Sequence, residues 1–305
     1  MKKLIYLFGI CLQVLMGSGA AHAQAVSAIS VRTQYVTVNG RRIAYRSLGD
    51  GIPIVFCNRF RGNLDTWDPL FLDNLARYYR VITFDYTGAG LSTGAPAADI
   101  GSYADDVRDL VKGLHLKKVV IGGWSLGGLV AQDFMTHYPE LVSSALLIDT
   151  GPAGTNPHGP EKVFFERAFK SVNDLADEKV LFYYPESPES MKAAEASHAR
   201  IERRKSGLDS VLEKTTWLKQ SQAIQGFAKD PDSVRSRLGN TGIPVLILSG
   251  DNDVAFPVGN WFPLIGKLPN IQLIILPLAG HGSEFQYPEL SVKYLHAFLG
   301  TSPNR

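Results

Sequence analysis

The sequence has 305 residues, with 31 basic and 29 acidic side chains, 45% hydrophobic residues and two cysteines. This length and composition suit one large α/β domain, or one domain that carries an insertion. The near balance of charge excludes the strong basic excess by which proteins bind nucleic acid or anionic membranes. Cys11 lies in a predicted leader, so Cys57 is left as a buried free thiol with no partner for an internal disulfide.

Residues 1–25 have the pattern of a secretory signal peptide. Lys2 and Lys3 precede a mostly apolar run at residues 4–16, and small residues follow, so that cleavage after Ala23 or Ala25 fits. The apolar run is shorter than the roughly 20 residues that span a bilayer, which favours a cleaved signal over a retained anchor. The mature protein is therefore predicted to be exported, periplasmic or secreted, without a membrane span.

The chain after this leader is predicted to open with a β-hairpin. Residues 33–38 and 41–48 alternate apolar and polar side chains around Asn39-Gly40, the strongest short signal for a hairpin turn. Three elements follow in the order strand, helix, strand, at residues 52–57, 67–78 and 79–84. The hairpin is expected at the edge of a sheet to which the later strands add.

Residues 85–92 (DYTGAGLS) predict a glycine-rich turn at a strand end. The turn lacks the G-x-G-x-x-G spacing of a dinucleotide-binding loop, and no helix starts directly after it, so no nucleotide cofactor is predicted. An amphipathic helix follows at residues 99–114, where apolar side chains recur at helical intervals.

Residues 117–131 predict a strand that turns abruptly into a helix, with one serine at the corner. Gly123 to Gly127 fit G-x-S-x-G, and residues 126–137 have helical spacing. Such a sharp turn needs glycine where a Cβ would collide, and it exposes the Ser125 hydroxyl beside the positive end of a helix. Ser125 is therefore the candidate nucleophile. Trp124, just before it, either packs against the sheet or walls a pocket.

The chain then changes character between two strands. The strand predicted at residues 143–148 is followed by a turn-rich linker and by charged amphipathic helices, and strand periodicity returns only at 243–248. Strands separated by helices indicate a mostly parallel, twisted sheet with helices on both faces. We therefore expect residues 26–150 and 241–305 to form an α/β core and residues 151–240 to form an inserted helical cap, with a few cap side chains lining a pocket.

Two later strands carry the candidate partners of Ser125. Asp253 follows the strand at residues 243–249, and His281 follows the strand at 271–276; a final helix is predicted at 288–299. The carboxyl ends of parallel strands meet at one edge of a sheet. A serine hydroxyl needs an adjacent base and a third group that orients the base. The order serine, aspartate, histidine is that of an elbow of this kind.

Other assignments of the base and the acid remain open at this point. The remaining histidines of the mature chain fall in predicted helices or linkers, which favours His281 as the base. Asp251, two residues from Asp253, is an alternative acid, although its place suits it better to organise the turn. Asp149, at the end of the preceding strand, is another.

Together these motifs resemble the α/β-hydrolase fold superfamily, in its serine-nucleophile branch with an inserted helical cap. The resemblance covers nearly all of residues 33–300. It rests on four segments: residues 123–127, residues 85–92 (similar to a D-x-x-G-x-G-x-S turn of that family), residues 250–253 and residues 280–282. It implies that Ser125 attacks an acyl carbonyl, that His281 takes and returns the proton, and that Asp253 orients and stabilises the imidazole. No metal or organic cofactor is implied.

The loop after the third strand departs from this family pattern. Such proteins usually carry His-Gly here, where this chain has Asn58 and Arg59. The resemblance assigns the oxyanion donors to the backbone N–H groups of Phe60 and Leu126, and losing one donor typically costs about 2.7 to 4 kcal/mol of barrier.

The arginines of this loop have two interpretations. Arg59 or Arg61 contacts an acidic group of the substrate, or each is an exposed loop side chain that is free or paired with Asp65 or Asp68.

The leading functional hypothesis is a serine hydrolase that cleaves a small-molecule carboxylic ester or related acyl substrate through an acyl-enzyme. A serine at the elbow argues against dehalogenases and epoxide hydrolases, whose similar fold carries an aspartate there. On the same three residues, perhydrolase or haloperoxidase-like, lactonase and carbon–carbon bond hydrolase activities are alternatives. The altered Asn58-Arg59 loop also admits a ligand-binding protein with little turnover.

Overall fold

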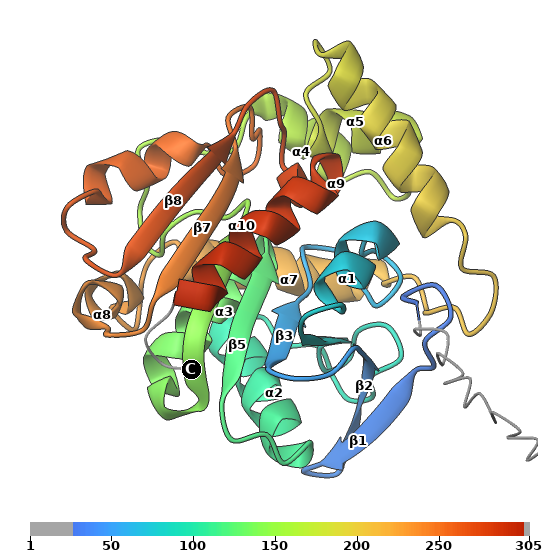
Figure 1. The fold of residues 1–305 in the computed structure, drawn as a ribbon, viewed down its shortest axis with the longest axis vertical. Helices are drawn as coiled ribbons and strands as arrows, with labels where there is room; N and C mark the ends of the chain where they lie inside the picture. The colour runs from blue at the N-terminus through green and yellow to red at the C-terminus, as the bar shows by residue number, and fades with distance from the viewer. Residues whose placement is uncertain (1–26, 302–305) are drawn as a thin grey trace, which may run out of the picture.

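The computed structural model describes residues 27–301, so the predicted signal peptide lies outside the described residues. They contain one eight-stranded sheet in the order β1-β2-β4-β3-β5-β6-β7-β8 (Figure 1). The strands are β1 (Gln34–Val38), β2 (Arg41–Leu48), β3 (Pro53–Cys57), β4 (Arg80–Phe84), β5 (Val119–Trp124), β6 (Val142–Ile148), β7 (Val245–Gly250) and β8 (Ile271–Leu276). Strand β2 pairs antiparallel with β1 and β4, and every other pairing is parallel.

The predicted hairpin is confirmed at the edge of this sheet. Val36 of β1 lies opposite Ile43 of β2, and both residues of the connecting turn have positive φ, 50° at Asn39 and 76° at Gly40. Positive φ at both central residues is the turn whose twist matches paired strands, which is why Asn-Gly is favoured there.

Helices cover both faces of the sheet, as predicted. The bounds of the core helices are α1 (Pro69–Leu75), α2 (Ile100–Gly113), α3 (Leu126–His137), α9 (Ser283–Gln286) and α10 (Pro288–Thr301). Figure 1 looks onto the face covered by α1 and α10, with α2 and α3 behind the strands. Successive strand residues serve the two faces: Val55 joins the apolar cluster with α2 and α3, and Phe56 joins the cluster with α1 and α10.

Helix α1 is shorter than the predicted helix at residues 67–78. Asp68 is its N-cap and accepts a hydrogen bond from the N–H of Leu70 at 2.8 Å, and Pro69 occupies the first helical position. A proline there cannot extend the helix backward, because it lacks the N–H that an earlier turn would need. Trp67 therefore stays outside the helix and packs against Phe71.

Five helices lie between β6 and β7, in the segment where the sequence predicts a helical cap. They are α4 (Lys162–Ala168), α5 (Leu175–Phe182), α6 (Pro188–Ile201), α7 (Lys214–Phe227) and α8 (Val234–Asn240). We call these helices and their connections the insert. In Figure 1, α5 and α6 rise above one end of the sheet, while α7 and α8 contact α3. The function of the insert as a cap stays a prediction.

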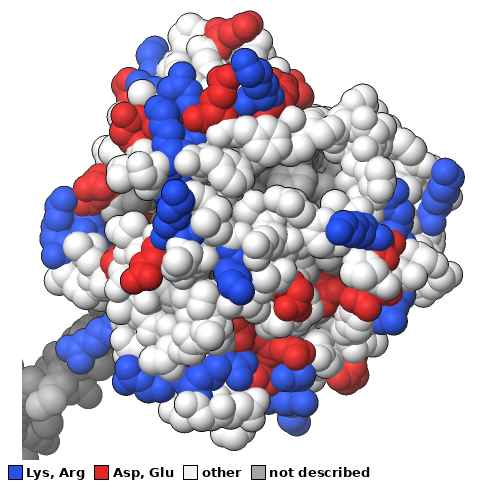
Figure 2. All heavy atoms as spheres, turned by 180° about the vertical axis from the view of Figure 1, so that it is seen from behind, with Lys and Arg blue, Asp and Glu red and all other residues white. Residues whose placement is uncertain are grey.

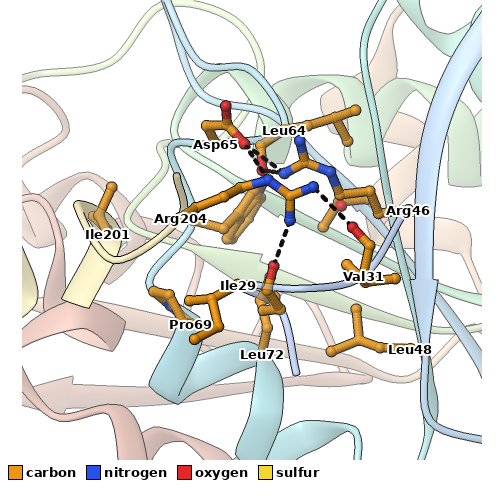
Figure 3. A pocket seen from close by; sticks show the side chains of 13 residues that line it. Ile29, Val31, Arg46, Leu48, Leu64, Asp65, Pro69, Leu72, Ile201 and Arg204 are labelled. Carbon is orange, nitrogen blue, oxygen red and sulfur yellow. Dashed lines mark hydrogen bonds and ion pairs between the residues drawn. The ribbon is translucent and has the colours of Figure 1, made fainter. Parts of the chain in front are cut away.

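Arginines of the insert bind it to the core. Arg204 donates hydrogen bonds to the carbonyl oxygens of Ala28 at 3.0 Å and Val31 at 2.8 Å, and Arg46 pairs with Asp65 beside it at 2.6 Å (Figure 3). The cavity among these side chains holds only about 20 Å³. The arginine N–H groups around it donate to protein oxygens, so these contacts hold the insert in position and leave little room or polar capacity for a ligand.

Among the described residues, no helix is both long enough and apolar enough to cross a bilayer.

Candidate active site

Ser125 stands at the corner between β5 and α3, with φ 59° and ψ −119°. This conformation is strained for a residue with a Cβ and persists only where the surroundings impose it. A Cβ on Gly123 would collide with the backbone of Gly127, and one on Gly127 would collide with the carbonyl of Cys57. The glycine spacing read from the sequence is thus a steric requirement of the turn.

The structure brings Ser125, His281 and Asp253 together. Nε2 of His281 lies 2.8 Å from Oγ of Ser125, and Nδ1 lies 2.9 Å from Oδ2 of Asp253. The other carboxylate oxygen, Oδ1, accepts hydrogen bonds from the N–H groups of Ala255 at 2.7 Å and Phe256 at 2.8 Å. The three side chains are buried. A hydroxyl, an imidazole and a fixed carboxylate in this order can transfer a proton from serine to histidine.

The alternative acids hold other positions. Asp149 accepts hydrogen bonds from the N–H groups of Gly250 at 2.8 Å and Ser283 at 2.7 Å, and so links the end of β7 to the start of α9 instead of contacting the imidazole. Burial, with the neighbouring charge of Asp253, raises the pKa of Asp149 to about 6. Asp251 is exposed and accepts from the N–H of Ala279 at 3.1 Å, which makes it an organiser of the turn.

Two backbone N–H groups beside Ser125 are free to bind an oxyanion. Within residues 27–301, neither the N–H of Phe60 nor that of Leu126 donates to a protein group. Asn58, where related folds carry histidine, is buried; its amide donates to the carbonyl of Phe84 at 2.7 Å, and its oxygen accepts from Trp67 at 2.7 Å. Hydrogen bonds of Asn58 therefore hold the path of this loop. The use of the two N–H groups in catalysis is a proposal.

The next loop arginine, Arg61, attaches this loop to the insert. Its guanidinium donates to the carbonyl oxygens of Ala168, Lys170 and Ser171, at 2.6 to 2.9 Å, around the end of α4. Its backbone N–H donates to Gln220 of α7 at 2.8 Å. No sequence pattern predicts these contacts, because every residue offers a backbone carbonyl as an acceptor.

Neither loop arginine pairs with Asp65 or Asp68, so the ion pairs considered from the sequence are wrong. Asp65 pairs with Arg46, and Asp68 pairs with Arg200 of α6 at 2.5 Å. Arg59 is largely buried, with its guanidinium 5.1 Å from the ring centre of Trp124 and 4.8 Å from that of Phe182. Burial lowers the pKa of Arg59 to about 10, which leaves it charged at neutral pH.

Trp124 packs in the core beneath the site instead of lining a cavity there. Its exposed fraction is 1%, and it contacts the rings of Trp67, Phe182 and Phe285. Its indole Nε1 donates a hydrogen bond to the carbonyl oxygen of His281 at 2.6 Å. The tryptophan before the serine therefore holds the backbone of the histidine.

Ser125 borders two cavities of different character. The larger holds about 380 Å³ and is mostly apolar; its lining includes Phe60, Phe164, Phe165, Phe169, Ile224 and Phe256. Figure 2 shows a hollow on the far face, bordered mainly by uncharged residues. His158, which the sequence placed in a linker remote from the elbow, also lines this cavity. The volume lies in the range of small-molecule sites.

The smaller cavity at Ser125 holds about 40 Å³ and is lined by charged groups as well. Arg59, Glu178 and His281 lie on its wall, with Phe182 and Leu181. An acyl compound bound at Ser125 thus has one large apolar space beside it and one small space with charged groups on a mostly apolar wall.

The glycine-rich turn at residues 85–92 has a structural role. The carboxylate of Asp85 accepts from the N–H groups of Leu64 at 3.1 Å and Leu91 at 3.0 Å, and Ser92 donates to its carbonyl at 2.7 Å. Burial, together with the nearby charge of Asp209 in the insert, raises the pKa of Asp85 well above its usual range.

One group within residues 27–301 has the composition of a metal site. Asp133, His137 and Asp232 place candidate ligand atoms within 4.8 Å of one another. Asp133 and His137 already pair at 3.2 Å on one helix turn, and none of the three lines a cavity at Ser125.

Comparison with known proteins agrees with this geometry. A family model described as alpha/beta hydrolase fold matches residues 52–286. An alpha/beta hydrolase fold protein from Chitinophaga pinensis superimposes with a TM-score of 0.80 at 29% identity, over 90% of this chain and 100% of that one.

Two curated relatives carry names for specific activities. A protein of Agrobacterium fabrum, provisionally named a carbamate hydrolase, is 28% identical over 81% of this chain and 92% of its own length. A Synechocystis protein, provisionally named a non-heme chloroperoxidase, is 27% identical over 87% of this chain and 99% of its own. The family match spans most of the chain and includes all three residues of the Ser125 site, so the chain belongs to the alpha/beta hydrolase fold family.

Proposed function

We propose that the protein is a serine hydrolase that cleaves a carboxylic ester or related acyl compound through an acyl-enzyme. The observation that carries this proposal is that Ser125, His281 and Asp253 lie within hydrogen-bonding distance of one another in that order. Ser125 also lines the large apolar cavity. Family membership supports hydrolysis in general, and the site supports this narrower reaction.

The distances at Ser125 support the first half of this reaction. Oγ of Ser125 attacks the acyl carbon while Nε2 of His281, 2.8 Å away, takes the hydroxyl proton. The carbonyl oxygen becomes an oxyanion, which the N–H groups of Phe60 and Leu126 stabilise. The tetrahedral intermediate then collapses: the bond to the leaving group breaks, and the imidazolium gives its proton to the departing oxygen.

The second half regenerates the enzyme. A water molecule gives one proton to His281 and its oxygen attacks the acyl carbon; the bond to Ser125 breaks, and the serine recovers its proton. Asp253 keeps the imidazole in one orientation throughout, because its other oxygen is fixed by two backbone N–H groups. The products are the free acid and the alcohol.

Labelling and kinetics of Ser125→Ala test the proposal. A fluorophosphonate probe should label the wild type at Ser125 and leave the variant unlabelled. With p-nitrophenyl esters of increasing acyl length, we expect the variant to lose at least about 10⁴-fold in kcat. The apolar cavity of about 380 Å³ predicts better turnover of medium acyl chains than of acetate. Equal turnover by both proteins would refute the proposal.

Two further reactions, suggested by the names of the relatives, belong in the same assay. They are carbamate hydrolysis and peroxide-dependent acyl transfer, both of which can proceed through an acyl group on serine. Their rates relative to ester hydrolysis rank the alternative activities. Tight binding of an acyl ligand with negligible turnover would favour a binding protein.

We also propose that the enzyme acts after export, on the basis of the basic, apolar and small-residue succession in residues 1–25. Cell fractionation with N-terminal sequencing tests this, and an unprocessed protein in the cytoplasmic fraction would contradict it.

A further inference from the structure

We infer that Arg59 binds a carboxylate carried by the leaving group of the substrate, so that the preferred substrate is an apolar acyl ester of a short hydroxy acid. This inference rests on the proposed function, and it adds a substrate class and a binding residue to it. Three observations carry it: an unpaired guanidinium, the charges around it, and the place of His281 between the two cavities.

The guanidinium of Arg59 has donors to spare. Nη1 donates to the carbonyl of Phe60 at 2.8 Å, while Nε is buried without any hydrogen-bond partner. Across residues 27–301, no carboxylate lies within 4.0 Å of Arg59. By contrast, the buried Arg46 and the partly buried Arg200 each pair directly with an aspartate. A largely buried cation that lacks a direct ion pair and leaves a buried donor unpaired is costly and calls for a specific reason.

The surroundings hold this cation in place without neutralising it. The rings of Trp124 and Phe182 lie 5.1 Å and 4.8 Å from the guanidinium carbon, a distance at which aromatic faces attract cations. Contacts with two rings restrict the position of the guanidinium. A guanidinium held in this way can present its N–H donors to a planar carboxylate.

The acidic side chains near Arg59 do not form an ion pair with it, although the charge of Glu178 partly offsets the lowering of the pKa of Arg59 by burial. Glu178 lies on the wall of the same small cavity, where its carboxylate lies 3.0 Å from Nδ1 of His198. Glu284 is buried elsewhere, and burial together with the charge of Asp149 raises its pKa well above the usual range. Arg61 adds a second positive charge to the cavity wall. Two arginines against one glutamate leave an excess of positive charge on the wall of the small cavity, which suits an anion.

The place of His281 decides which half of the substrate carries this anion. The imidazole returns its proton to the leaving-group oxygen, so the leaving group must lie against His281. His281 lies on the wall of the small cavity with Arg59, while the lining of the large cavity includes Ser125 but not His281. The acyl chain accordingly occupies the large apolar cavity. The small cavity, of about 40 Å³, takes a short charged leaving group.

A matched pair of esters tests the inference. The first is hexanoyl glycolate, whose leaving group carries a carboxylate; the second is the corresponding hexanoyl glycolamide, which has the same shape and no charge. The readout is the ratio of their kcat/KM values. We expect the wild type to prefer the carboxylate by about 10- to 100-fold, the range of a charge-assisted hydrogen bond.

Variants of Arg59 locate the preference. Arg59→Met keeps an unbranched apolar stem against Trp124 and Phe182 but removes the charge, and it should bring the ratio close to one. Arg59→Lys keeps a charge without the fork and should retain part of the preference. Arg77→Met is the matched control: Arg77 is exposed and lies outside the site, so its loss should leave the ratio unchanged.

The outcomes separate this inference from the proposed function. Hydrolysis of both esters by the wild type without a preference would overturn the inference alone, as would an Arg59→Met variant that loses both rates equally. A preference seen only when the carboxylate is on the acyl side, as in a succinate half-ester compared with its amide, would overturn the placement of the leaving group. If Ser125→Ala matched the wild type on every ester, the proposed function itself would fail.

Discussion

Oδ2 of Asp253 lies 2.9 Å from Nδ1 of His281, and the other oxygen of the same carboxylate is held by two backbone N–H groups. The carboxylate therefore has one orientation in which it serves the imidazole. We predict that Asp253→Asn lowers kcat by about 10² to 10⁴-fold with little change in fold, because an amide favours the wrong imidazole tautomer.

Asp251→Asn is the control for this substitution. Asp251 lies two residues away, is exposed and accepts from Ala279, which an asparagine oxygen also does. Its kcat should stay within about threefold of the wild type. Comparable losses in both variants would assign the effect to the turn and not to the carboxylate at His281.

Trp124→Phe should lower activity through the backbone of His281. The indole is the donor to the His281 carbonyl at 2.6 Å, and removing it leaves a buried acceptor unpaired, at a cost of about 1 to 3 kcal/mol in the free energy of unfolding. We expect kcat to fall several-fold and the fluorophosphonate labelling rate to fall with it.

A second tryptophan separates the hydrogen bond from the loss of ring volume. Trp217 is nearly as buried as Trp124, its ring contacts Phe60 and Phe169, and no hydrogen bond from its indole occurs among the described residues. Trp217→Phe removes the same atoms without orphaning a carbonyl. If it slowed the labelling of Ser125 as much as Trp124→Phe, the proposed role of the indole hydrogen bond would be wrong.

Glu284→Gln should change how stability depends on pH. Burial and the charge of Asp149 raise the pKa of Glu284 in the folded state above its unfolded value. A raised folded pKa favours folding below the unfolded pKa, and this contribution is lost as pH rises through the folded pKa. The glutamine variant stays neutral, so its stability relative to the wild type should increase from pH 4.5 to pH 8.5.

Urea unfolding at several pH values measures this difference. We expect this difference to grow steadily toward the alkaline end of the range. Glu140→Gln, at an exposed position, serves as the control and should show a flat difference. A flat difference for Glu284→Gln as well would show that this carboxyl ionises normally in the fold.

Arg200→Met should destabilise the attachment of α6 to the core. Asp68 is fully buried and accepts from Nη2 of Arg200 at 2.5 Å and from Ser197 at 2.7 Å. Removing one partner of a buried ion pair leaves a charge without compensation and costs about 3 to 5 kcal/mol.

Unfolding in urea and amide hydrogen exchange along α6 provide the measurement. Lys192→Met, on the exposed side of the same helix, is the matched control and should change neither. Adding Asp68→Asn to the Arg200 variant should recover part of the loss, since the orphaned charge is then gone. Unchanged exchange in α6 would mean that other contacts hold it.

The sequence predicted the elements that repeat a simple pattern. Apolar runs placed the parallel strands, and Asn39-Gly40 placed the hairpin, because periodicity and positive φ are local properties. The glycines beside Ser125 could be predicted for the same reason, because the collisions that exclude a Cβ there arise at one tight turn.

The meeting of Ser125, Asp253 and His281 followed from the predicted parallel sheet, but most other contacts between distant parts of the chain could not be predicted from local patterns. The partners considered for the loop arginines were aspartates a few residues away, whereas Asp65 and Asp68 pair with Arg46 and Arg200. His158 lines the large cavity from a segment that reads only as a linker. A side chain's direction within an irregular segment depends on the packing of the whole insert, which no local pattern encodes.

The loop that carries Phe60 is fastened to the insert from two directions, through the backbone of Arg61 to Gln220 and through its guanidinium to the carbonyls after α4. A displacement of α4 or α7 would therefore also move the backbone next to Phe60, the proposed oxyanion donor. We expect a substrate that is too large for the apolar cavity to lower kcat more than it weakens binding, because it displaces this donor.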